Sequence, residues 1–247
     1  MKIANGVEML EISLNMMGRQ TTINPVLIWD DETVILVDTG FPGPNVSQKI
    51  REAVAEAGVS FDKLNKVILT HQDIDHIGGL PDILNASQHK IEVLAHENEK
   101  PYIQGEKRLV KASKGRMTQL DSLPEAQRNA IKAVFENPPK ANVDSTIADG
   151  EELPYCGGIT VIYTPGHTPG HICLYLKQSK TLITGDALNV VDGKLIGPNP
   201  QHAFDMELTI QSLKKLTQYD VETVICYHGG VYRDDANQRL AELASGQ

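Results

Sequence analysis

Four short segments of the sequence carry residues that can bind metal ions. The first reads His71-Gln-Asp-Ile-Asp-His76, with two histidines and two aspartates within six residues. The other three contribute His167, Asp186 and His228. Imidazole nitrogens and carboxylate oxygens are common ligands of divalent cations. Burying these groups together without a cation would be costly, because neighbouring carboxylates resist joint ionisation. The pattern therefore predicts a metal centre.

The first segment has a spacing that suits two metal ions. His71, Asp73 and Asp75 alternate along the sequence, so in an extended chain they point to one side. His76 follows directly and points elsewhere. One segment can therefore provide His71 and Asp73 for one ion, and Asp75 and His76 for another.

Predicted strands and helices must bring the four segments together. Each segment follows a short apolar run typical of a buried strand, at residues 66–70, 158–163, 181–184 and 221–226. Further strands are predicted at residues 7–14, 26–29, 34–37, 91–95 and 172–176. Apolar residues at helical spacing predict helices at 46–57, from about 79, at 205–216 and at 234–244. In the 205–216 helix, Met206, Ile210, Leu213 and Leu216 are expected on one face. This order favours an α/β protein with two packed sheets and outer helices, and with the segments meeting at one sheet edge.

Residues 97–154 differ from the rest of the chain because they show no clear strand pattern. Two helices, at 103–112 and 124–135, fit this long polar stretch. We therefore predict a single domain over 1–247, with a helical insertion at about 97–154 that covers the site. Lys100–Arg116 holds six basic residues and one acidic residue, and Lys107, Lys111 and Lys114 would share a helix face. The stretch is either a basic lid that attracts an anionic substrate or a solvated or dimer-contact face.

Composition narrows the class of protein. The chain has 247 residues, 40% of them hydrophobic, and a net charge of −9. This is typical of a soluble globular protein, and the acidic balance disfavours nucleic acid as a partner. We expect no secretory signal at the N-terminus, no membrane span and a cytoplasmic location. Cys156, Cys173 and Cys226 form no CxxC motif and are expected to be buried core residues.

The four segments, with Asp38 before them, resemble the motifs of the metallo-β-lactamase superfamily in order and spacing. The resemblance implies a four-layer αβ/βα sandwich with two divalent metal ions at one edge of the sheets. It implies that His71 and His167 bind the first ion, and that Asp186 bridges both ions. The implied ligands of the second ion are Asp75, His76 and His228. Asp38 would lie behind the ligands and hold an imidazole by a hydrogen bond.

Asp73 departs from the commonest family pattern, HxHxDH, because it stands where a third histidine is usual. Three interpretations are open: Asp73 ligates the first ion directly, it acts through water, or the working enzyme holds one ion. A carboxylate favours harder ions such as Mn²⁺ or iron. Zn²⁺ is still the first expectation, because His/Asp sites suit it and the family commonly uses it.

The resemblance implies hydrolysis of a small ester, lactone or thioester by a metal-activated hydroxide. Asp75 or Asp186 would hold or relay a proton. Asn189, three residues after Asp186, is either an amide donor to the developing oxyanion or an exposed loop residue. A di-iron oxidoreductase of the same fold is the alternative, since such relatives carry an acid at the position of Asp73. The substrate is expected to be a small molecule, anionic if the basic lid exists, and the oligomeric state is open.

The remaining histidines are not among the predicted metal ligands. His171 is expected to be a hydrogen-bonded structural residue. His96 is expected at the surface or at a helix start, and His89 in an exposed loop. His202 is placed near the site.

Overall fold

Alternating side chains in the central strands divide the apolar residues among separate cores. In β6 (Val34–Val37), Val34 and Leu36 pack on one side of the sheet, and Ile35 and Val37 pack on the other. Successive side chains of a strand point to opposite faces of its sheet. A strand that is apolar at every position must therefore be covered on both faces.

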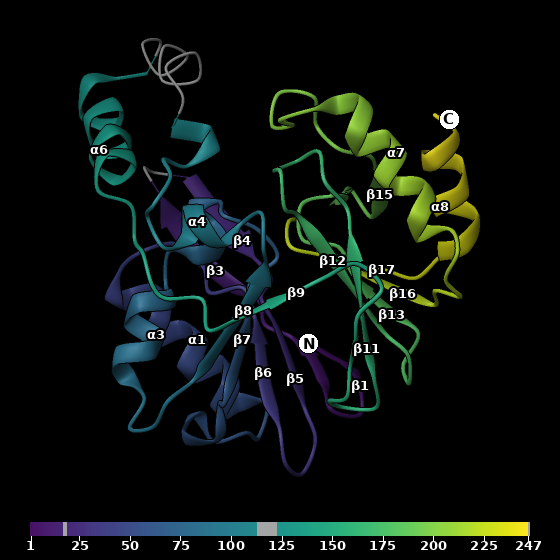
Figure 1. Cartoon of the computed structure of the whole chain (residues 1–247), viewed down its shortest axis with the longest axis horizontal. Coiled ribbons are helices and arrows are strands. Elements are labelled where there is room, and N and C mark those ends of the chain that lie inside the picture. The colour runs from purple at the N-terminus through teal and green to yellow at the C-terminus, as the bar shows by residue number, and fades with distance from the viewer. Residues whose placement is uncertain (17–18, 113–122, 247) are drawn as a thin grey trace.

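The chain forms two sheets that pack face to face in a computed structural model, which describes residues 1–16, 19–112 and 123–246 (Figure 1). The seven strands of the first sheet are, in spatial order, β1 (Lys2–Ala4), β2 (Val7–Met9), β5 (Val26–Trp29), β6, β7 (Lys66–Ile68), β8 (Glu92–His96) and β9 (Ser145–Ile147). Its strands from β6 to β9 run parallel.

The second sheet has six strands and faces the first across the middle core. In spatial order they are β10 (Glu152–Leu153), β11 (Ile159–Tyr163), β12 (Ile172–Leu176), β13 (Thr181–Ile183), β16 (Thr223–Cys226) and β17 (Gly230–Tyr232). Its neighbouring strands are antiparallel except for the pair β13 and β16, which is parallel. Two separate hairpins complete the strands: β3 (Ile12–Met16) with β4 (Arg19–Ile23), and β14 (Asn189–Val191) with β15 (Lys194–Ile196).

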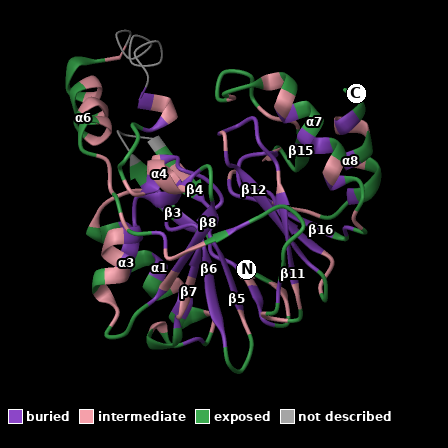
Figure 2. Ribbon diagram, in the orientation of Figure 1, coloured by how far each residue is buried: buried purple, intermediate pink, exposed green. Residues whose placement is uncertain are grey.

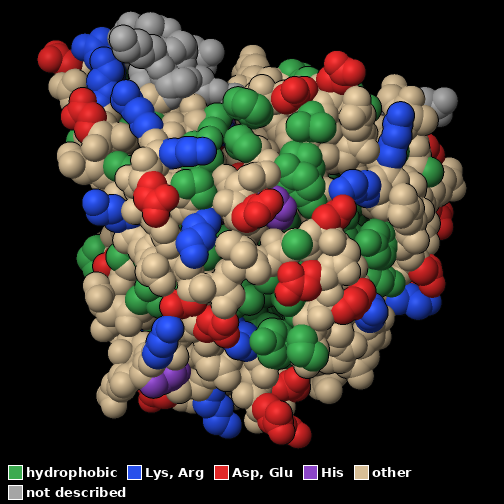
Figure 3. All heavy atoms as spheres, viewed as in Figure 1, with side chains coloured by type: hydrophobic (Ala, Val, Ile, Leu, Met, Phe, Trp, Pro, Cys, Tyr) green, Lys and Arg blue, Asp and Glu red, His purple; other side chains and the backbone are tan. Residues whose placement is uncertain are grey.

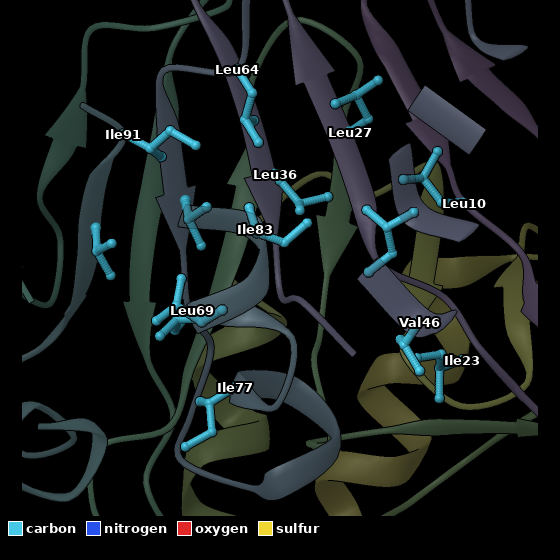
Figure 4. Packing of buried hydrophobic residues seen from close by; sticks show 14 of the residues in the cluster. Leu10, Ile23, Leu27, Leu36, Val46, Leu64, Leu69, Ile77, Ile83 and Ile91 are labelled. Atoms are coloured by element: carbon cyan, nitrogen blue, oxygen red, sulfur yellow. The ribbon is translucent and has the colours of Figure 1, made fainter. Parts of the chain in front are cut away.

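Helices cover the outer face of each sheet. Against the first sheet lie α1 (Pro44–Glu56) and α3 (Leu80–Ala86), and the apolar core beneath them is drawn in Figure 4. Against the second sheet lie α7 (Met206–Leu216) and α8 (Ala236–Ser245). Burial is concentrated in the strands and on the inward faces of these helices (Figure 2). The order of layers is helix, sheet, sheet, helix, so the predicted four-layer αβ/βα sandwich is confirmed.

Three more of the described helices lie between β7 and β9 in the sequence, and the two that Figure 1 labels lie in the upper left of the view. They are α2 (Ile74–Ile77), α4 (Lys100–Ile103) and the longer α6 (Glu125–Glu136). Two 3₁₀ turns lie at Phe61–Lys63 and Val110–Ala112. None of the described helices is long and apolar enough to cross a bilayer.

The segment 97–154 differs in two ways from its prediction. It is not free of strands, because β9 and β10 lie within it and each forms an edge of one sheet. The helix predicted at 103–112 is also wrong. Helix α4 ends at Ile103, Gly105 follows with a φ of +76°, and only a 3₁₀ turn forms before residue 113. The helix predicted at 124–135 is confirmed as α6.

Two burial predictions need correction. Ile210 of α7 is 41% exposed, and Thr209 and Ser212 are buried instead, because their hydroxyls donate to the carbonyls of Asp205 and Pro165. Cys156 is only partly buried. Cys173 and Cys226 are core residues, as expected, and burial raises the pKa of each thiol to about 12, so neither is a ready nucleophile.

Candidate metal centre

The candidate ligands follow strands that end at the same edge of the two sheets. His71 lies just beyond β7, His167 beyond β11, Asp186 beyond β13 and His228 beyond β16. The two sheets meet at this edge, since the Ile172 amide donates to the Thr70 carbonyl oxygen. Loops at the carboxyl ends of strands carry the functional groups here, as in other α/β proteins.

All seven predicted ligands come together in two groups. Within each group, one potential ligand atom from every residue lies within 4.8 Å of the others. The first group comprises His71, Asp73, His167 and Asp186. The second comprises Asp75, His76 and His228.

The carboxylate of Asp186 lies between the two groups and turns one oxygen to each. Its Oδ2 is 3.4 Å from His167 Nε2 and 3.9 Å from His71 Nε2. Its Oδ1 is 3.2 Å from His76 Nε2 and 3.5 Å from His228 Nε2. This is the placement that a carboxylate bridging two cations requires.

Buried polar atoms without a hydrogen bond provide a test of whether cations fit here. Among the described side chains, the buried Nε2 atoms of His71 and His76 and the buried Oδ1 of Asp186 make no hydrogen bond. Buried polar atoms are nearly always paired, and an unpaired one destabilises the fold. All three atoms point into the two groups, where a divalent cation would satisfy them. The donor set of imidazoles and carboxylates fits Zn²⁺ and also Mn²⁺ or iron.

The buried carboxylates and imidazoles of the centre shift one another's pKa values: the carboxylates raise the pKa of His76 and His228 against the effect of burial, whereas the pKa of His71 is lowered. Burial and the neighbouring His76 ring lower the pKa of His71 to about 4, so this ring is neutral at pH 7, as a ligand must be. Burial alone would raise the pKa of Asp186, but the His76 and His228 rings hold it well below its usual range. Asp186 is therefore ionised at neutral pH and can ligate a cation.

Asp38 holds the imidazole of His76 from behind, as the resemblance implied. Its Oδ2 is 2.8 Å from His76 Nδ1, while its two oxygens also accept from the Thr70 amide and hydroxyl at 2.9 and 2.8 Å. The residue has a φ of +62°, an unfavourable conformation for a residue other than glycine. A carboxylate that accepts from Nδ1–H leaves Nε2 of His76 free to face the second group.

Asp38→Asn is expected to weaken binding of the second ion by about 10- to 100-fold. An amide nitrogen facing His76 Nδ1 cannot accept its proton, so the ring takes the other tautomer and Nε2 carries the hydrogen. If the side-chain amide is rotated by 180°, its nitrogen faces the Thr70 N–H instead, and two hydrogen-bond donors then oppose each other. Calorimetric titration with Zn²⁺ measures the effect. Asp205→Asn, which changes a carboxylate to an amide at the N-cap of α7, is the control. Equal affinities in both variants would contradict this role.

Lys111, part of the basic stretch expected either as a lid or as a solvated or dimer-contact face, lies at the site, in a contact with Asp73 that the sequence did not reveal. Its ammonium contacts Asp73 Oδ2 and lies 3.2 Å from His167 Nε2. Asp73 Oδ2 is itself 2.8 Å from His167 Nε2 and 3.2 Å from His71 Nε2. Burial alone would raise the pKa of Asp73, but the Lys111 charge and the His71 ring hold it well below its usual range. A positive charge therefore lies beside the first group.

The rest of the predicted basic lid does not form one helix face. Lys107 is exposed and lies 5.5 Å from the centre of the Tyr102 ring, and the backbone between it and the 3₁₀ turn that carries Lys111 is not helical. Lys114 and Arg116 lie outside the described residues. On the face shown in Figure 3, basic side chains gather over α6 instead.

Glu99 is a second residue that the sequence did not reveal, because nothing in its spacing links it to the ligands. It is fully buried and accepts hydrogen bonds from Gln72 Nε2, the Thr168 hydroxyl and the Gly170 amide. Burial raises its pKa to about 7 against the effect of these donors. Glu99 thus joins the loop that carries His71 to the loop that carries His167.

The other predicted residues are placed as follows. Asn189 and the exposed His202 both line a polar cavity of about 830 Å³, together with Asp75, His167, Asp186 and His228. His171 is buried, with Nδ1 2.9 Å from the Thr164 hydroxyl, and its Nε2 accepts from the Asp186 amide at 3.2 Å, which fits the structural role expected. His89 is exposed, as expected. The surface position expected for His96 is wrong, because its ring is buried and stacks on Tyr163.

Known proteins are similar to this chain in sequence. A sequence model of the metallo-beta-lactamase superfamily matches residues 18–228. A probable metallo-hydrolase of Bacillus subtilis, YflN, is 26% identical over 216 residues, which cover 81% of this chain and 76% of that protein. The hydroxyacylglutathione hydrolase GloC of Haemophilus influenzae is 30% identical over 175 residues, 67% of this chain and 66% of that protein.

A solved structure agrees with the fold. The metallo-beta-lactamase family protein TTHA1429 of Thermus thermophilus superimposes with a TM-score of 0.75 at 24% identity, over 99% of this chain and 80% of that one. The two sheets and their outer helices are thus those of an established fold. Together with the superfamily match and the candidate cation groups, this leads to one conclusion: the chain belongs to the metallo-beta-lactamase superfamily and is a metal-dependent hydrolase.

Proposed function

We propose that the enzyme holds two divalent ions, with Zn²⁺ as the first choice, and hydrolyses the carbonyl bond of a small ester, lactone or thioester. The observation that supports this most is the position of Asp186, whose two oxygens face two separate ligand groups. The close approach of Asp73 to His71 and His167 supports direct ligation over action through water. When bound, the two ions would supply an activated water and polarise the carbonyl.

The residues around the ions would position the substrate. Asp75 lines the polar cavity with a 20% exposed side chain, and its Oδ2 is 3.2 Å from His228 Nε2. It is therefore placed to hold the proton released during attack. The Lys111 ammonium lines the same cavity and can attract a negatively charged substrate group once a cation takes its place beside Asp73.

Asn189 would donate from its side-chain amide to the oxyanion that develops on the substrate carbonyl. It is half-buried in the cavity wall, and the next residue is fixed to the site because the Val190 amide donates to the His228 carbonyl. Asn189→Ala is expected to lower kcat/KM by about 100-fold, the effect typical of one oxyanion donor, with unchanged metal content. Asn85→Ala, on the exposed side of α3, is the control. Unchanged kinetics in Asn189→Ala would remove this residue from the mechanism.

A substrate panel tests the function itself. The metal-free protein is reconstituted separately with Zn²⁺, Mn²⁺ and Fe²⁺, and assayed with p-nitrophenyl acetate, γ-butyrolactone and an acetyl thioester. We expect metal-dependent turnover of at least one of these carbonyl compounds, and colourless zinc protein to be active. The alternative function is that of a di-iron oxidoreductase of the same fold, because such relatives carry an acid at the position of Asp73. A coloured, iron-containing protein that consumes oxygen and hydrolyses nothing would replace our proposal with it.

A further inference from the structure

An apolar cavity of about 330 Å³ lies beside the metal centre, beneath α6. Apolar side chains form most of its wall. From the body of the protein they are Phe41, Ile74 and Leu109, and from α6 they are Ile131, Val134 and Phe135. At about 30 Å³ for each water molecule of the liquid, the cavity has the volume of roughly eleven waters. It can therefore take a small organic group.

The apolar face of α6 is only partly covered by protein, although Phe135 packs against the core. Ile131, Val134 and Phe135 have the spacing of one helix face, and all three point into the cavity wall. None of the residues of α6 is fully buried. Apolar surface left in contact with water is unfavourable by about 25 cal/mol per Å². An apolar ligand that covered this face would gain that free energy.

The apolar cavity adjoins the polar cavity above the candidate ligands. Phe41, Asp75 and Lys111 line both. Asp73 also lines the apolar cavity, so its inner end lies at the first ligand group. A molecule with one apolar end beneath α6 therefore extends directly to the atoms that would carry out hydrolysis.

We propose that this cavity is a subsite for the acyl or aryl group of the substrate, so that the enzyme prefers esters or thioesters of medium-length apolar acids. The subsite rests on the proposed function, because it assigns the substrate of the same site. The carbonyl carbon lies at the boundary formed by Asp75 and Lys111, and the leaving group lies in the polar cavity. Hydrolysis forms a bond between the water oxygen and the acyl carbon and breaks the bond from that carbon to the ester oxygen or thioester sulfur. One proton of the water goes to the released alcohol or thiol, and the acyl group leaves as the acid.

A series of p-nitrophenyl esters from acetate to octanoate tests the subsite with the Zn²⁺-loaded enzyme. Each buried methylene is expected to raise kcat/KM by about fourfold, the equivalent of about 0.8 kcal/mol. The increase should stop when the cavity is full. A flat dependence on chain length would overturn the proposal.

Two matched variants distinguish the effect of filling the cavity from the effect of a substitution elsewhere on α6. Ala130 and Ala133 are both exposed residues of α6, but Ala130 lines the cavity and Ala133 does not. Ala130→Phe should lower kcat/KM for hexanoate at least tenfold more than kcat/KM for acetate, while Ala133→Phe should change neither. Equal effects of the two variants, or an equal loss for acetate and hexanoate, would contradict the subsite.

Binding of hexanamide distinguishes failure of the subsite from failure of the proposed function. NMR observation of this neutral amide with the Zn²⁺-loaded protein reports binding without turnover. We expect hexanamide to bind, acetamide not to bind, and Ala130→Phe to weaken hexanamide binding. If hexanamide binds in this way but no ester is cleaved, the subsite stands and the proposed function fails. If Ala130→Phe instead changes the oligomeric state and leaves hexanamide binding intact, a second copy of the chain covers α6 and the subsite is wrong.

Discussion

Asp186→Asn is expected to lower kcat/KM by more than about 1,000-fold and to reduce the affinity for both ions. The two oxygens of Asp186 face different ligand groups, and an amide nitrogen cannot ligate a cation. Whichever way the amide turns, one group therefore loses a ligand. The activated water that the two ions would supply is expected to be lost with it. Steady-state kinetics and elemental analysis of the same preparation measure both effects.

Asp192→Asn is the control for this substitution. Asp192 is an exposed residue with a φ of +49°, a conformation that asparagine tolerates well. It should keep full activity and a full complement of metal. If Asp186→Asn bound two ions as tightly as Asp192→Asn, Asp186 would not bridge them.

Removal of the metal ions is expected to produce the second largest effect, a large loss of thermal stability. The buried carboxylates of Asp73 and Asp186 lie near unpaired imidazole nitrogens, and a bound cation satisfies them together. Free Zn²⁺ at 1,000 times its dissociation constant stabilises the folded state by about 4 kcal/mol per site. For a chain of this size, that raises Tm by roughly 8–16 °C.

Thermal unfolding with and without a chelator measures this stabilisation. The Tm of Asp186→Asn should respond much less to Zn²⁺ than that of the wild type, because its two sites are weakened. A wild-type Tm that stays the same when the ions are removed would contradict the assignment of these residues as ligands.

The sequence was sufficient for the parts of the site that lie next to strands. His71, His167, Asp186 and His228 each follow an apolar strand, so both the element and the position of its loop could be predicted locally. The bridging role of Asp186 came from the resemblance, because nothing local indicates that its two oxygens face two groups. The resemblance also placed Asp38 behind the ligands, holding an imidazole, and the structure shows that this imidazole belongs to His76.

Long-range packing decided the features that could not be predicted. Lys111 was predicted on a helix face, either as part of a basic lid or as a solvated or dimer-contact residue, but the helix ends before Gly105 and the following chain brings Lys111 to Asp73. Glu99 belongs to the site only through hydrogen bonds to two distant loops. The strands β9 and β10 are too short for a periodic pattern, and pairing with β8 and β11 determines them.

Helix α7 shows another reason why the spacing of apolar residues does not always predict which residues are buried. Ile210 fitted the apolar face, yet Ser212 takes a buried position because its hydroxyl has a backbone carbonyl to pair with. Local sequence does not show which polar residues will find such partners. Burial of a hydroxyl is therefore harder to predict than burial of an isoleucine.

The central claim is that residues at the ends of strands, from four distant segments, surround two cations. X-ray diffraction from crystals of the Zn²⁺-loaded protein, measured at the zinc absorption edge, tests this claim most directly. Two anomalous peaks are expected, one among His71, Asp73 and His167 and one among Asp75, His76 and His228, with Asp186 between them. The Lys111 ammonium should then have moved away from Asp73. A single peak in the second group, with Lys111 still bound to Asp73, would contradict the account.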